Sequence, residues 1–176
     1  MTASIITGVG SRSTPPKILA EMIKIGRWCL DNGVWVRSGH ADGADWAFEM
    51  GSQEKCIAYI PWASFNSHLK SRAKIRVLTD KEVSMQTDLV KELHPAPDRL
   101  SEGAFRLMRR NVCQIMGETP QSPLTNAVVC WTEGGKLSGG TAFAMRLAHK
   151  LNIPVFNMYG YGTSAAEQAI KFIENL

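Results

Sequence analysis

The chain has 176 residues, of which 44% are hydrophobic and 20% charged, a composition typical of a soluble globular protein with a proper core. Twenty Lys and Arg against sixteen Asp and Glu give a net charge of +4, which suits an anionic ligand but falls short of a dedicated nucleic-acid-binding arm. No apolar stretch approaches the ~20 residues that a membrane helix needs. We therefore expect one domain over residues 1–176, located in the cytoplasm.

Predicted strands and helices alternate along the chain, which indicates a parallel sheet covered on both faces. In chain order, we expect strands at 4–9, 34–36, 56–60, 126–131 and 153–157, and helices at 15–32, 44–50, about 80–94, 100–116, 140–151 and 164–175. The run 126–131 is the clearest strand, and its apolar character places it inside the sheet. The predicted fold class is α/β, a three-layer sandwich with a mainly parallel central sheet.

The cysteines and histidines favour neither disulfides nor a metal site. The four cysteines are far apart, with no Cys-x-x-Cys pair, and Cys56 and Cys130 lie in or beside apolar runs. We expect buried free thiols in a reducing cytosol. The four histidines are dispersed and lack ligand spacing, so no metal site is predicted, although a divalent ion could accompany a bound phosphate.

Three loops rich in small residues each follow a predicted strand and precede a predicted helix. They cover residues 8–14, 38–45 and 133–141. Because the carboxyl ends of parallel strands meet at one edge of a sheet, the loops should gather there, with backbone N–H groups and helix N-termini facing a ligand. The sequence therefore predicts a binding site for a phosphorylated molecule.

The first and third loops carry the clearest candidates for ligand binding. Gly8 and Gly10 would allow close backbone approach, Ser11 offers a hydroxyl donor, and Arg12 has the planar fork that suits a phosphate. In the third loop, Gly139, Gly140 and Thr141 open a helix and would direct backbone donors at an anion. Ordinary strand-to-helix turns also use glycine, and this alternative stays open.

The second loop offers Ser38, Gly39 and Gly43 as backbone or hydroxyl contacts to the ligand. Asp45 follows them and could hydrogen-bond a ribose hydroxyl, or it could cap its own helix or brace the loop. These two interpretations are evenly balanced.

Aromatic and basic residues in the middle of the chain add further candidates. Trp62 could stack on a base while Asn66 reads the base edge, or the aromatic residues could form a wall of the core or a dimer contact. On the predicted helix 100–116, most of the arginines should be solvated, and Arg110 is the one that could point into the site.

The three loops together resemble a known superfamily. Gly10-Ser11-Arg12, the pattern Ser38-Gly39-x-Ala41-x-Gly43-x-Asp45, and Gly139-Gly140-Thr141 look like the SLOG superfamily of Rossmann-like proteins. That superfamily joins DNA-processing protein A (DprA/Smf) with the lysine-decarboxylase-like LOG proteins. The resemblance covers about residues 5–157 and implies a Rossmann-like fold, a nucleotide-type ligand, a small stand-alone phage or bacterial protein, and a homo-oligomer.

The chain departs from the family at one catalytic position. Members that cleave the N-glycosidic bond of a nucleoside monophosphate carry Gly-Gly-x-Gly-Thr-x-x-Glu, and Ala144 stands here in place of the glutamate. Asp45, Glu49 and Glu133 are the remaining candidates for acid or base catalysis. The protein could therefore be a nucleotide sensor, a sequestering protein or an N-glycoside hydrolase. The alternative is a DprA-like module that binds single-stranded DNA, with the phosphates held at the same sheet edge or by the basic helix 100–116.

Overall fold

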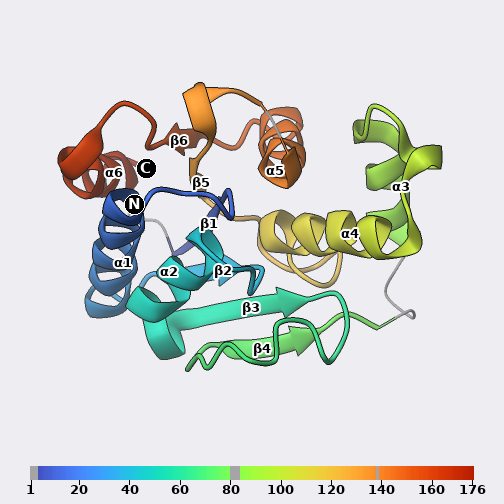
Figure 1. The fold of residues 1–176 in the computed structure, drawn as a ribbon, viewed down its shortest axis with the longest axis horizontal. Helices are drawn as coiled ribbons and strands as arrows, with labels where there is room; N and C mark the ends of the chain where they lie inside the picture. The colour runs from blue at the N-terminus through green and yellow to red at the C-terminus, as the bar shows by residue number, and fades with distance from the viewer. Residues whose placement is uncertain (1–3, 80–83, 138) are drawn as a thin grey trace.

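The computed structural model describes residues 4–79, 84–137 and 139–176, and a six-stranded sheet forms its centre (Figure 1). Each pair of neighbouring strands is parallel, in the order β4-β3-β2-β1-β5-β6. The strands are β1 Ile5–Gly10, β2 Trp35–Ser38, β3 Cys56–Ile60, β4 Lys74–Val77, β5 Ala127–Trp131 and β6 Val155–Asn157. The predicted α/β class with a parallel central sheet is confirmed.

Helices lie on both faces of the sheet, namely α1 Pro16–Asp31, α2 Ala44–Ser52, α3 Ser84–Leu93, α4 Glu102–Met116, α5 Gly139–Lys150 and α6 Ala165–Glu174. One core cluster joins α1, α2 and α6 to the sheet and contains Phe48 and Val129, whereas the other joins α3, α4 and α5 and contains Val112 and Val128. The neighbours Val128 and Val129 point to opposite faces of β5, as strand geometry requires. No helix within the described ranges is long and apolar enough to cross a lipid bilayer.

Strand β5 lies inside the sheet between β1 and β6, as its apolar sequence predicts, and all five of its residues are buried. Strand β4 departs from the sequence prediction. Its four exposed residues lie at the edge of the sheet and alternate between charged and apolar side chains, a pattern too short to separate the strand from the preceding loop. The predicted helix at about 80–94 begins outside the described residues, and α3 is described from Ser84.

Two glycines let α1 and α2 cross at close range. A Cβ atom on Gly26 would lie 2.7 Å from the carbonyl oxygen of Phe48, and one on Gly51 would overlap the carbonyl oxygen of Ile23. Because no side chain separates the two helices here, α2 is held firmly against α1. Its first turn, which carries Asp45, is thereby fixed near the carboxyl ends of the central strands.

Candidate functional site

A cleft of about 420 Å³ opens at the carboxyl ends of β1 and β5, where the first and third loops meet α4. Its lining includes the predicted site residues Gly10, Ser11, Arg12, Asp45, Arg110, Glu133, Gly139, Gly140 and Thr141. The predicted residues outside the lining are Gly8, Ser38, Gly39, Gly43, Glu49, Trp62 and Asn66. The structure therefore brings the first and third loops to one cavity, and the second loop lies mostly behind it.

The first loop presents one uncommitted cation to the cleft. Arg12 is exposed, and its side chain forms no hydrogen bond or ion pair within residues 4–79, 84–137 and 139–176. The Ser11 hydroxyl lies 2.7 Å from the Ser13 hydroxyl, so the two serines already share a hydrogen bond. A Cβ atom on Gly10 would lie 2.6 Å from the Cβ atom of Ala44, so this glycine lets α2 pack against the strand end.

Several predicted glycines and serines support the loops from behind. A Cβ atom on Gly8 would overlap the ring of Phe48, so Gly8 is required for packing of α2 on β1. Gly43 has a φ of 82°, a left-handed conformation that favours glycine, and it lies against the backbone of the first loop. The Ser38 hydroxyl donates to the backbone carbonyl of Asp45 at 3.2 Å. These residues shape the site without lining the cleft.

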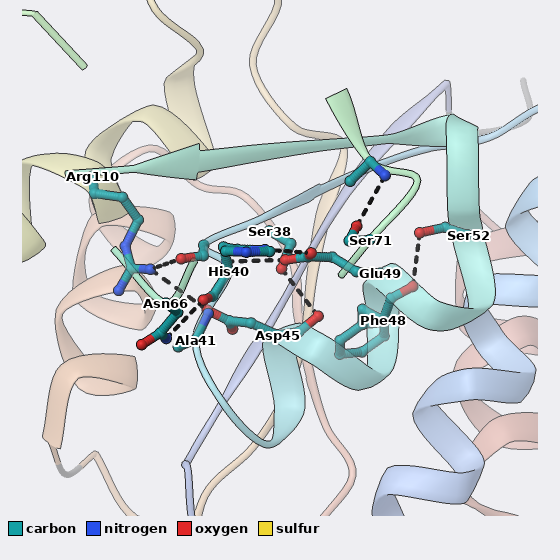
Figure 2. Close-up of polar contacts among 12 residues, drawn as sticks. Ser38, His40, Ala41, Asp45, Phe48, Glu49, Ser52, Asn66, Ser71 and Arg110 are labelled. Carbon is teal, nitrogen blue, oxygen red and sulfur yellow. Dashed lines mark hydrogen bonds and ion pairs between the residues drawn. The ribbon is translucent and has the colours of Figure 1, made fainter. Parts of the chain in front are cut away.

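A polar cluster holds the second loop and consists of the buried residues His40, Asp45, Glu49 and Arg110 with the half-buried Asn66 (Figure 2). One Glu49 carboxylate oxygen accepts from the His40 backbone N–H at 3.0 Å, and the other lies 2.8 Å from His40 Nδ1. The Asn66 amide donates to the His40 carbonyl oxygen at 2.9 Å. Glu49 is therefore committed to His40, whose backbone has the unusual positive φ of 56°.

Burial and hydrogen bonding shift the pKa values of two groups in this cluster, Asp45 and His40. Asp45 Oδ2 lies 3.6 Å from a guanidinium nitrogen of Arg110, which also donates to the Gly39 carbonyl oxygen. Burial nevertheless raises the pKa of Asp45 to about 6, against the lowering by the Arg110 charge and with a smaller rise from Glu49. The hydrogen bond to Glu49 raises the pKa of His40 above its usual value. The Asp45 carboxyl group therefore keeps its proton to a higher pH than an ordinary aspartate.

Helix α4 turns one face toward the cleft, with Leu107, Arg110, Asn111 and Gln114 at helical spacing. The Asn111 amide donates to the Gly140 carbonyl oxygen at 3.2 Å and so ties α4 to the start of α5. Gln114 was not predicted, although its spacing of four residues from Arg110 is a signal that could have found it. It is only 1% exposed.

Two expectations about neighbouring arginines have different outcomes. Arg106 pairs with Glu102 at 2.7 Å on the outer side of α4, in agreement with the expected solvated position. Arg109 is buried, which contradicts that expectation, because α4 lies between the sheet and the helices that pack on it and has little surface left for solvent.

The aromatic loop after β3 does not reach the cleft. Trp62 is half-buried and meets Phe65 edge-on, with ring centroids 5.3 Å apart. Phe65 is buried beneath the Arg110 guanidinium, whose central carbon lies 5.7 Å from the ring centroid. The Asn66 amide is occupied by His40. This placement favours the wall interpretation of Trp62 over base stacking.

The third loop completes the rim of the cleft. Gly139 has a φ of 64° and begins α5 together with Gly140 and Thr141. The first N–H groups of a helix lack intrahelical acceptors, so this end offers donors and a partial positive charge. Glu133 is exposed on the same rim, and Lys136 is exposed but does not line the cleft.

The described residues also show how the cysteines and the possible metal ligands are placed. All four cysteines are buried, none of them forms a disulfide with another described residue, and burial raises the pKa of Cys29 to about 12. Among the described residues, no group of three or more His, Cys, Asp or Glu side chains is placed to hold a metal ion.

Comparison with known proteins bears on the fold. No protein-family model matches the sequence, and no curated protein matches it. The chain is similar to DNA processing protein A from Helicobacter pylori, studied for its single-stranded DNA binding mode, with 18% identity, a TM-score of 0.62, and coverage of 97% of this chain and 73% of that one. It is also similar to the Moco carrier protein from Chlamydomonas rheinhardtii, with 15% identity and a TM-score of 0.55 over the whole of both chains. At these identities the comparisons establish the Rossmann-like fold.

Proposed function

We propose that the cleft binds a small ligand with an anionic group, namely a nucleotide or a nucleotide-derived molecule. The observation that carries this proposal is the convergence of the uncommitted Arg12 side chain and the N-terminus of α5 on one cavity. An Arg fork binds phosphate oxygens in pairs, and a helix N-terminus offers backbone donors to the same group. Both lie at the carboxyl edge of the parallel sheet, where such folds bind ligands.

The size and remaining lining of the cleft fit a mononucleotide. Small-molecule sites commonly enclose about 300–1,000 Å³, and this one has about 420 Å³. Val9, Leu107 and Met108 provide apolar walls against which a flat ring can pack. A ligand with a phosphate at the rim and a ring between these walls would use both parts of the cavity.

Removing the Arg12 side chain tests the proposed anion site. The Arg12→Ala variant should bind AMP, GMP, CMP and UMP about tenfold more weakly or worse, because a charge-assisted contact to phosphate is lost. Isothermal titration calorimetry measures the affinities. Lys136→Ala is the matched control, since Lys136 is an exposed cation of the third loop that does not line the cleft, and it should change affinity less than about twofold. Equal losses in the two variants would mean that only general positive charge matters.

Ligand retention and N-glycoside hydrolysis are two uses of the same cleft. Asp45 and Glu133 line it, whereas Glu49 does not and is bonded to His40. Hydrolysis would consume water and release the free base and ribose 5-phosphate from a nucleoside monophosphate. Chromatography of the incubated nucleotide distinguishes the two uses, because a sensor or sequestering protein returns the nucleotide unchanged.

Single-stranded DNA is the second candidate, since the similar Helicobacter pylori protein was studied for binding it. The arginines of α4 do not form an exposed stripe here, because Arg109 and Arg110 are buried and Arg106 is paired with Glu102. This arrangement favours the small ligand. Titration of a fluorescent oligothymidine at low and moderate salt tests the candidate, and affinity that persists at moderate salt would favour DNA.

A further inference from the structure

We propose that the Gln114 side-chain amide recognises the polar edge of a heterocyclic ring, so that the ligand class is a nucleotide whose base presents a donor beside an acceptor. This inference rests on the proposed function and assigns the deep end of the same cleft. It makes Gln114 a specificity-determining residue, separate from the anion site at Arg12.

The amide of Gln114 is buried without a partner. Neither its Oε1 nor its Nε2 atom has a hydrogen-bond partner within residues 4–79, 84–137 and 139–176, although the residue is only 1% exposed. A primary amide has two N–H donors and an acceptor oxygen, and buried groups of this kind are nearly always satisfied in native proteins. Gln114 lines the cleft, and a rotation of its side chain would turn the buried amide toward a bound ligand that supplies the missing partners.

The position of Gln114 separates it from the anion site. The Thr7 hydroxyl donates to the Gln114 backbone carbonyl at 2.6 Å, which places this turn of α4 against the buried strand β1. Arg12, by contrast, is exposed at the rim. A ligand that contacts both residues therefore has its charged group near solvent and its other end in the interior. The apolar residues Val9 and Ala144 line the same cleft and suit the faces of a flat ring.

The chemistry of an amide selects the kind of group that can satisfy it. Its oxygen and nitrogen lie side by side in one plane, so it pairs best with an acceptor next to a donor. Nucleobase edges have this arrangement, and Gln is a known bidentate partner of adenine. A phosphate or a carboxylate offers acceptors alone, so it would leave the Gln114 oxygen unsatisfied.

Two substitutions of similar volume test the inference by calorimetry. Gln114→Met removes donor and acceptor, and Gln114→Glu keeps acceptors but loses the donor when ionised. The probes are AMP, GMP, CMP, UMP, purine riboside 5′-monophosphate, which lacks an exocyclic group, and ribose 5-phosphate, which lacks a base. Gln168→Met on α6 is the matched control, because Gln168 is half-buried and does not line the cleft.

The expected result is a change in selectivity with the anion site intact. The parent protein and Gln168→Met should bind the preferred nucleotide at least about tenfold more tightly than ribose 5-phosphate. Both Gln114 variants should bind ribose 5-phosphate like the parent, to within about twofold, and should lose most of that tenfold preference. The melting temperature of the unliganded Gln114→Met variant should not fall, because no hydrogen bond to a described residue is removed.

The outcomes separate the two proposals. Equal affinity of the parent for ribose 5-phosphate and for every nucleotide, or unchanged selectivity in both Gln114 variants, would overturn the role of Gln114 and leave the anion site standing. Absence of binding by all of these probes would overturn the proposed function and this inference with it.

Discussion

The Arg110→Met variant is expected to be about 3 kcal/mol less stable than the parent protein at pH 7. The Arg110 guanidinium lies 3.6 Å from Asp45 Oδ2 and donates to the Gly39 carbonyl oxygen, and all of these groups are buried. Methionine would fill part of the space but would leave both acceptors without this donor. Loss of one partner from a buried ion pair typically costs about 3–5 kcal/mol, and uptake of a proton by Asp45 keeps the expected loss at the lower end.

Arg106→Met provides the matched control on the same helix, one turn earlier. Arg106 pairs with Glu102 near the surface, so its replacement should cost less than about 0.5 kcal/mol. Urea unfolding followed by circular dichroism measures the free energies of unfolding. The double variant Arg110→Met/Asp45→Asn should recover part of the loss, because it removes the carboxylate that lost its partner. Equal losses in the two single variants would contradict the account of Arg110 as the cation that holds the second loop.

The fold could be predicted because strong local patterns agree with the tertiary structure. The predicted strand at 56–60 matches β3, and the apolar run at 126–131 forms β5 inside the sheet. Strand β4 was missed because its charged and apolar residues alternate over only four exposed positions, too short a pattern to predict a strand, and its place is fixed by pairing with β3. Such pairing joins distant residues and leaves little local signal.

The candidate site could be predicted in part, for a similar reason. Loops that follow parallel strands meet at one edge whatever their detailed shape, so Arg12 and Thr141 could be placed together from the sequence. The ion pair of Asp45 with Arg110 and the pairing of His40 with Glu49 depend on how α4 and α2 pack beside the second loop. Those contacts arise from tertiary packing and leave no local signal in the sequence, and the same is true of the unpaired Gln114 amide.

The Asp45→Asn variant is expected to be more stable than the parent protein above pH 6. Burial raises the pKa of Asp45 from 3.8 to about 6 in the folded protein. This difference corresponds to about 3 kcal/mol, because the folded state disfavours the ionised carboxylate while the unfolded state does not. The sign follows from proton binding: between about pH 4 and pH 6 the folded protein holds the proton more tightly, so the contribution of Asp45 to stability falls as pH rises through this window.

Asparagine resembles the protonated carboxyl group and cannot ionise, so the variant should lack this fall in stability. Urea unfolding at pH 4 should give similar free energies for the two proteins, and at pH 7 the variant should exceed the parent by about 3 kcal/mol. His40 and Glu49 remain in both proteins, so their titration contributes to both curves. A constant difference at pH 4 and pH 7 would show that Asp45 does not titrate in this window.

The same carboxyl group should make anion binding depend on pH, because Asp45 lines the cleft that contains Arg12. Sulfate keeps its charge between pH 5 and pH 8, so any change in its affinity reports on the protein. We expect the parent to bind sulfate more tightly at pH 5 than at pH 7.5, and Asp45→Asn to bind it with similar affinity at both values. Calorimetry measures both affinities. If the parent shows no such change, the anion lies too far from Asp45 to be repelled by it, and the Arg12 side of the cleft alone would hold the charge.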